Sequence, residues 1–149
     1  MYKHILISTD GSETAQKGVD HGLSLAKSLG AAVTLVTVTE PFPFQTSAAG
    51  AGWVPGPSDI AGYQESQKEH AAAILAAWQA AAAQLGVQVE TLHVPNAAPA
   101  EAIVETARTK GCSLIVMASH GRRGIRRLLL GSQTAEVLAD SPVPVLVVR

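Results

Sequence analysis

Four arginines and three glycines lie close together in the segment ASHGRRGIRRLLLGSQTAE, which runs from Ala118 to Glu136. The segment has no acidic residue before Glu136, although the whole chain has a formal net charge of −1. Glycine lets a backbone approach an anion closely because it has no Cβ. The N–H groups of a glycine-rich turn that leads into a helix bind oxyanions, and arginine pairs well with phosphate. We therefore predict that this segment binds phosphate.

Two other interpretations of the arginine segment stay open. A run of charge is often a solvated loop. Arginines also suit nucleic acid, but no aromatic residue lies among these four, so nucleic acid is the weaker prediction. Two common phosphate motifs do not occur: the chain has no G-x-x-x-x-G-K-[S/T] run, and no G-x-G-x-x-G follows the first predicted strand.

Catalysis by side chains has less support in the sequence. Ser119 and His120 are a nucleophile and a base by type, but neighbours at a strand end diverge and no orienting carboxylate is evident. The five histidines show no metal-ligand spacing. Cys112 precedes an apolar run and is expected to be a small core residue.

The segments that must position these residues alternate between strand and helix patterns. Short runs rich in β-branched residues predict strands at 4–9, 31–38, 87–94, 112–119 and 142–149. Apolar residues at helical spacing predict a helix over 15–29, one that ends near Leu85, one that Pro99 opens, and one over 132–140. Ser12 is the expected N-cap of the first helix, which ends at Gly30.

The second predicted helix follows an unusual stretch. Residues 40–60 contain four prolines, three glycines and three aromatic residues, which predicts a long loop. Its aromatic residues, Phe42, Phe44 and Trp53, form either a lid over a ligand or a surface segment. The helix that follows ends at Gly86. Its predicted buried stripe is Ala71, Ile74, Trp78, Ala81 or Ala82, and Leu85.

Alternating strands and helices predict an α/β fold with a parallel sheet covered by helices on both faces. Right-handed crossovers favour a doubly wound, Rossmann-like arrangement. Ligands of such folds bind beyond the carboxyl ends of the strands, where the strand order reverses. We expect Ser8-Thr9-Asp10 and Met117-Ala118-Ser119 to line that crevice. Asp10 either contacts the ligand or caps the first helix, and one carboxylate can do both.

The composition is that of a globular protein. The 149 residues fit one domain, 1–149, and 47% of them are hydrophobic. The single cysteine favours a reducing compartment. The start of the chain does not resemble a signal peptide, and no apolar run approaches the length of a membrane span. We therefore expect a cytoplasmic protein that does not insert into membranes.

The chain resembles the universal stress proteins. Nucleotide-binding members carry a glycine, two residues, a second glycine, nine residues, a third glycine and then serine or threonine. Here the same spacing joins Ala118, Gly121, Gly131 and Ser132, with alanine in the place of the first glycine. The opening ILISTDGSE and the ending PVPVLVVR resemble the first and last strands of the family, with Ser8 where many members have proline.

The resemblance implies a five-stranded parallel sheet of order 3-2-1-4-5, a homodimer, and binding of ATP (or AMP or ADP) with Mg²⁺. Asp10 would lie near the ribose or adenine, and the backbone of Val38 would bond the adenine edge. Met117 and Ala118 would form the floor. The full set of implied nucleotide-binding residues is Ser8, Thr9, Asp10, Val38, Met117, Ala118, Ser119, His120, Gly121, Arg122, Arg123, Gly124, Gly131, Ser132, Gln133 and Thr134.

The last strand predicts a partner. In the order 3-2-1-4-5 it lies at the sheet edge, and an apolar edge strand from Val143 to Val148 favours pairing with a second copy. The expected function is a dimeric, ATP-binding regulator of a stress response that acts on a downstream protein still to be identified. The alternative is a dimeric interaction protein that binds no nucleotide. An enzyme is not expected, because the S-G-G-x-D-S and H-I-G-H signatures do not occur, although slow ATP hydrolysis stays open.

Overall fold

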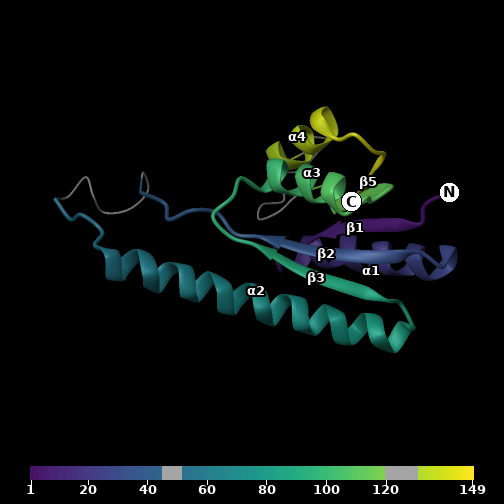
Figure 1. Cartoon of the computed structure of the whole chain (residues 1–149), viewed down its shortest axis with the longest axis horizontal. Helices are drawn as coiled ribbons and strands as arrows, with labels where there is room; N and C mark the ends of the chain where they lie inside the picture. Colours follow the sequence, from purple (N-terminus) through teal and green to yellow (C-terminus); the bar gives the residue numbers. More distant parts are fainter. Residues whose placement is uncertain (45–51, 120–130) are drawn as a thin grey trace.

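The computed structural model describes residues 1–44, 52–119 and 131–149. Its core is a five-stranded sheet of order β3-β2-β1-β4-β5, in which all neighbours are parallel. The strands are β1 (His4–Ser8), β2 (Ala32–Val38), β3 (Val89–Val94), β4 (Leu114–Ala118) and β5 (Val145–Val148). The helices are α1 (Glu13–Leu29), α2 (Pro57–Leu85), α3 (Pro99–Thr109) and α4 (Ser132–Asp140). The predicted α/β class and strand order are confirmed (Figure 1).

Helices cover both faces of the sheet and create two apolar layers. Successive strand residues point to opposite faces, so Ile5 and Ile7 pack in one layer while Leu6 packs in the other. The first layer contains residues of α1 and α2, and the second contains residues of α3 and α4. The connections therefore change face between β1 and β4. At that point the carboxyl ends of the strands are left open, as the doubly wound arrangement requires.

The ends of α1 form as the sequence predicts. Ser12 has an extended backbone, and its Oγ accepts a hydrogen bond from the Ala15 N–H at 3.2 Å. Gly30 ends the helix in the left-handed region with φ of 64°. These caps fix where the helix begins, directly after the turn that follows β1.

The predicted loop over residues 40–60 is too long at its carboxyl end. α2 begins at Pro57, with Gly56 as N-cap and the Gly56 N–H bonded to Asp59 Oδ2 at 2.8 Å. Proline suits the first position of a helix because its missing N–H has no partner there. The high proline content therefore marks a helix start as well as a loop. Residues 45–51 of the predicted loop lie outside the described residues.

α2 packs along the β2–β3 side of the sheet and extends beyond it at its amino end (Figure 1). Ala71, Leu75 and Ala82 are buried, while Ile74 and Trp78 are half-buried. Leu85 is 39% exposed, so its place in the predicted buried stripe is wrong. It is the last residue of the helix. None of the helices in the described part of the chain is both long and apolar enough to span a membrane.

Candidate functional site

A cleft of about 410 Å³ opens at the carboxyl ends of β1, β2 and β4. Side chains from α2, α3 and α4 complete its walls. Among the residues that the sequence singles out, those lining the cleft are Ser8, Thr9, Asp10, Val38, Met117, Ala118, Gln133 and Thr134. The fold thus brings together two segments more than a hundred residues apart, together with the start of α4.

The other singled-out residues fall into two groups. Ser119, Gly131 and Ser132 adjoin the cleft without lining it. The Gly131 N–H donates to the Ser119 carbonyl at 2.9 Å, which ties the end of β4 to the start of α4. His120, Gly121, Arg122, Arg123 and Gly124 lie outside the described residues.

Sequence reasoning missed the contribution of α2, and of β2 it singled out Val38 alone. Thr37, Thr39 and Glu40 line the cleft at and just beyond the end of β2. Tyr63, Gln67 and His70 line it from α2, and their spacing of four and three residues places them on one helix face. That spacing was visible in the sequence, but the first of these positions follows closely on residues assigned to a loop. The remaining lining residues are Ala15, Val36, Pro99 and Ile103.

The turn after β1 holds Asp10 at the mouth of the cleft. The Thr9 N–H donates to the Val36 carbonyl at 3.0 Å and continues the β1–β2 pairing. Asp10 Oδ1 accepts from the Ser12 N–H at 2.9 Å, and Thr9 Oγ1 accepts from the Gly11 N–H at 3.1 Å. Gly11 has φ of 80°, a conformation that glycine adopts without strain. One carboxylate oxygen of Asp10 therefore supports the turn, while the residue remains exposed.

The start of α4 is fixed against β4 and α3. Thr134 Oγ1 donates to the Ala118 carbonyl at 3.2 Å, and Gln133 Oε1 accepts from the Ala100 N–H at 3.0 Å. Gly131 is the N-cap of α4. The first-turn N–H groups of an α-helix have no partner within the helix and carry its positive dipole end. This end of the cleft suits an anion.

The methyl group of Ala118 packs towards α1. A Cβ built on Gly18 of α1 would lie 3.5 Å from Ala118 Cβ and 3.1 Å from the Ala118 nitrogen. Because Gly18 has no side chain, the end of β4 can pack close to α1.

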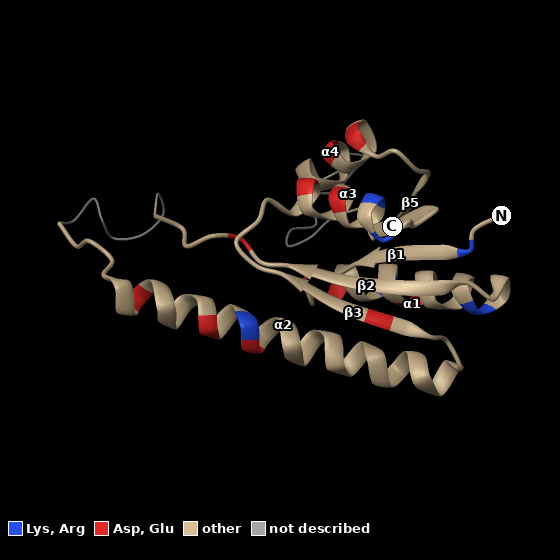
Figure 2. Ribbon diagram, viewed as in Figure 1, with Lys and Arg blue, Asp and Glu red and all other residues tan. Residues whose placement is uncertain are grey.

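Charge on the described lining is acidic. Asp10 and Glu40 carry it, and no lysine or arginine belongs to the lining among the described residues. Figure 2 shows an acidic residue, in red, where the chain leaves β2. The described residues contain no group of three or more His, Cys, Asp or Glu side chains that could hold a metal ion.

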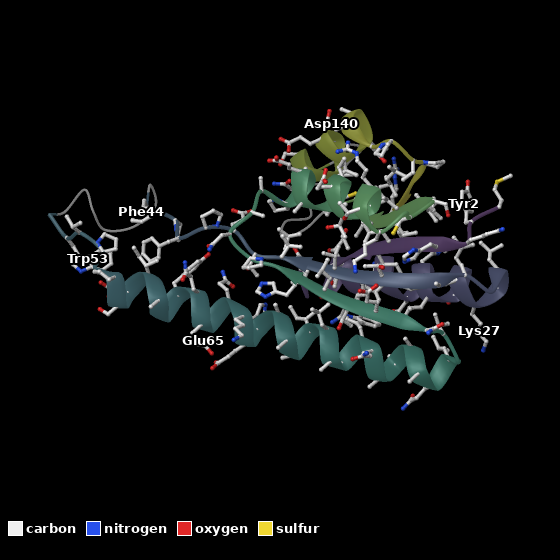
Figure 3. All side chains as sticks on the ribbon, viewed as in Figure 1. Tyr2, Lys27, Phe44, Trp53, Glu65 and Asp140 are labelled. Carbon is white, nitrogen blue, oxygen red and sulfur yellow. The ribbon has the colours of Figure 1, made fainter. Side chains whose placement is uncertain are left out.

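Aromatic residues of the predicted loop pack against one another and against Tyr63 of the cleft wall. The Phe42 ring lies 4.9 Å from that of Phe44 and 5.3 Å from that of Tyr63, measured between centroids. Figure 3 shows Phe44 and Trp53 near the amino end of α2, and both are largely exposed. Phe42, Phe44 and Trp53 do not line the cleft. Both predicted alternatives, a lid and a surface segment, therefore stay open.

Two titratable groups have altered pKa values. Burial lowers the pKa of His93, whose Nε2 is hydrogen-bonded to Thr39 Oγ1 at 2.8 Å. Burial raises the pKa of the Cys112 thiol to about 11. Cys112 is 5% exposed beneath α3, which confirms it as a core residue.

A model of the universal stress protein family matches residues 1–149. Universal stress protein YxiE of Bacillus subtilis is 35% identical over the full length of both chains. Universal stress protein MJ0531 of Methanocaldococcus jannaschii is 34% identical over all of this chain and 83% of its own. The solved structure of protein MJ0577 has a TM-score of 0.81 at 29% identity and covers 99% of this chain and 96% of its own. A solved universal stress protein in complex with cAMP has a TM-score of 0.73 at 27% identity and covers 99% of this chain and 97% of its own.

Gly18→Ala should lower the free energy of unfolding by about 1–2 kcal/mol, because the new methyl group would press on the β4 backbone. Urea denaturation measures this. Gly62→Ala in α2 is the matched control, since a Cβ there meets no atom within 4 Å. It should raise stability by about 0.5–1 kcal/mol. Equal gains for both variants would contradict the close approach of α1 and β4.

His93 should make stability depend on pH. The pKa of His93 in the folded protein lies below 6.5, so its contribution to the free energy of unfolding is fully present above pH 6.5. That contribution is lost as the pH falls below 6.5 towards the folded-state pKa, since the unfolded chain takes up the proton more readily. Urea titrations at several pH values should show a shallower acid slope for His93→Gln than for wild type. Identical slopes would contradict this assignment.

Proposed function

Because the chain belongs to the universal stress protein family, we propose that it binds an adenine nucleotide in the cleft and acts as a dimeric, cytoplasmic regulator of a stress response. The observation that carries the proposal is the cleft itself. It lies at the reversal of strand order, and the amino end of α4 adjoins it. Its volume of about 410 Å³ is in the range of small-molecule sites.

We assign the phosphates to the α4 end. Helix-start N–H groups of Ser132, Gln133 and Thr134 suit phosphate oxygens, and the arginine-bearing segment precedes them in the chain. In the same assignment Asp10 contacts the ribose, the Val38 backbone bonds the base, and Met117 and Ala118 lie beneath it. Ser8, Thr9, Ser119, His120, Gly121, Arg122, Arg123, Gly124 and Gly131 complete the proposed site.

A related protein supports the ligand class. The relative at 27% identity was solved in complex with cAMP, an adenine nucleotide. ATP is our proposed ligand here, with AMP and ADP as alternatives. Mg²⁺ would accompany a triphosphate and be held mainly through phosphate oxygens, as this ion commonly is. The hydroxyl and backbone N–H donors at the start of α4 fit the phosphates of such a complex.

The alternative function is a dimeric interaction protein without nucleotide. The feature that favours it is Ala118, because it lines the cleft at the place of a motif glycine. The packing of its methyl group towards Gly18 supports nucleotide binding instead. Adenine nucleotide released on denaturing freshly purified protein would decide between the two.

Titration calorimetry with ATP, ADP and AMP, each with and without Mg²⁺, tests the proposal. We expect a Kd for ATP in the micromolar range, weakened at least about tenfold by combined Gly131→Val and Ser132→Ala substitutions, since phosphate would lose charge-assisted hydrogen bonds. Ser66→Ala, an exposed position of α2, is the control and should bind as wild type. Absence of binding heat, with no nucleotide carried through purification, would contradict the proposal.

The proposed dimer forms through β5. β5 is an edge strand. The carbonyls of Pro144 and Val148 accept hydrogen bonds from β4, so the backbone groups of Val145 and Val147 face away from the sheet. These outward groups would pair with a second copy.

Val147→Pro removes one outward N–H without breaking the β4–β5 pairing. We expect light scattering at micromolar concentration to give the mass of two chains for wild type and a shift towards one chain for Val147→Pro. Val147→Ala keeps the N–H and should remain dimeric. A wild-type mass of one chain, or no effect of proline, would rule out this interface.

A further inference from the structure

Thr37 carries a buried hydroxyl without a hydrogen-bond partner among the described residues. Thr37 is a lining residue of the cleft near the end of β2, and it is 2% exposed. Buried hydroxyl groups are almost always bonded, because an unpaired one retains the full cost of losing water. A valine would pack in the same volume without that cost. Thr37 therefore needs a partner that the described residues do not supply.

The other buried threonines show that the fold can satisfy such groups. Thr34, on the same strand, is bonded to His4 Nε2 at 2.8 Å, and Thr39 to His93 Nε2 at 2.8 Å. Thr106 and Thr134 donate to backbone carbonyls. The unpaired hydroxyl occurs at a cleft-lining position, which points to a ligand as its partner.

The β2–α2 wall that contains Thr37 is polar and held in place by hydrogen bonds. Tyr63 OH donates to the Glu40 carbonyl at 3.2 Å and accepts from Gln67 Nε2 at 2.8 Å. These bonds connect α2 to the chain that leaves β2. They also orient the Gln67 amide, whose oxygen and second N–H are a further acceptor and donor. Both Tyr63 and Gln67 line the same cleft as Thr37.

The acidic charge on this side of the cleft disfavours phosphate. Glu40 and Asp10 are the charged residues of the described lining, and both are acidic. An anion would be repelled here, whereas a neutral group with donors and acceptors would not. The cleft is thus polarised, with an acidic, hydroxyl- and amide-bearing wall at β2 and α2 and the helix dipole at α4.

We propose that Thr37 and Gln67 form a subsite that recognises the uncharged nucleoside end of the ligand through hydrogen bonds and so determines which nucleotide binds. This inference rests on the proposed function and deepens it. The bonded group is either a ribose hydroxyl or the polar edge of the base. Both offer the neutral donors and acceptors that this wall can pair with.

The variants Thr37→Val and Thr37→Ser test the subsite, with AMP as the probe in calorimetry and thermal denaturation as the second measurement. Thr37→Val should weaken AMP binding about tenfold while keeping or raising the melting temperature of the free protein, because it removes an unpaired buried hydroxyl. Thr37→Ser keeps a hydroxyl and should bind within about threefold of wild type. Gln67→Leu should also weaken AMP binding.

Thr34→Val is the matched control on the same strand. It removes a bonded hydroxyl away from the cleft, so it should lower the melting temperature and leave the Kd for AMP unchanged. Deoxy-AMP and inosine monophosphate distinguish the two bonded groups. The subsite predicts that wild type discriminates against one of them and that Thr37→Val loses that discrimination.

Each outcome has one meaning. If wild type binds AMP and Thr37→Val binds it equally well, the subsite is wrong while the proposed function stands. If Thr37→Val destabilises the free protein as Thr34→Val does, the hydroxyl has an internal partner and the subsite is also wrong. If wild type binds no adenine nucleotide, the proposed function and the subsite both fail.

Discussion

Between β1 and β4 the crossover helices change from one face of the sheet to the other. The rest of the structure depends on this constraint. Parallel strands require crossover helices, and right-handed crossovers place α1 and α2 on one face and α3 and α4 on the other. No crossover can then cover the carboxyl ends of β1 and β4 together. The polar turn after β1 and the start of α4 face each other across that opening because the topology leaves them no other place.

The walls of the opening show how the fold divides apolar and polar groups. Along β1 and β4 the buried side chains are almost all aliphatic, whereas the buried residues just beyond the strand ends are polar. At the end of β4 the carbonyls of Ala118 and Ser119 accept hydrogen bonds from Thr134 Oγ1 and the Gly131 N–H. Among the described residues, the buried Thr37 hydroxyl is the side-chain group that has no hydrogen-bond partner, and Thr37 is one of the lining residues of the cleft.

Much of the fold could be predicted because periodicity and capping are local signals. The strands of continuous β-branched residues, the Ser12 cap and the glycine stops all appear in the sequence, and the structure has them. The start of α2 was missed because proline is common both in loops and at the first position of a helix. Only the three-dimensional structure distinguishes the two cases. The exposure of Leu85 depends on where the sheet ends, which helical spacing alone does not give.

The site was predictable in part for the same reason. The place of residues near a strand end, such as Asp10 and Met117, can be predicted from the topology. The β2–α2 wall could not be predicted in this way, because it depends on the packing angle of a long helix against the sheet.

The central claim is that a nucleotide binds in this cleft, and backbone amide NMR during an ATP titration tests it most directly. We predict saturable shifts confined to residues 8–10, 37–40, 63–70, 117–124 and 131–134 and their neighbours. No saturable shift, or shifts centred on the outer face of α1, would contradict the account.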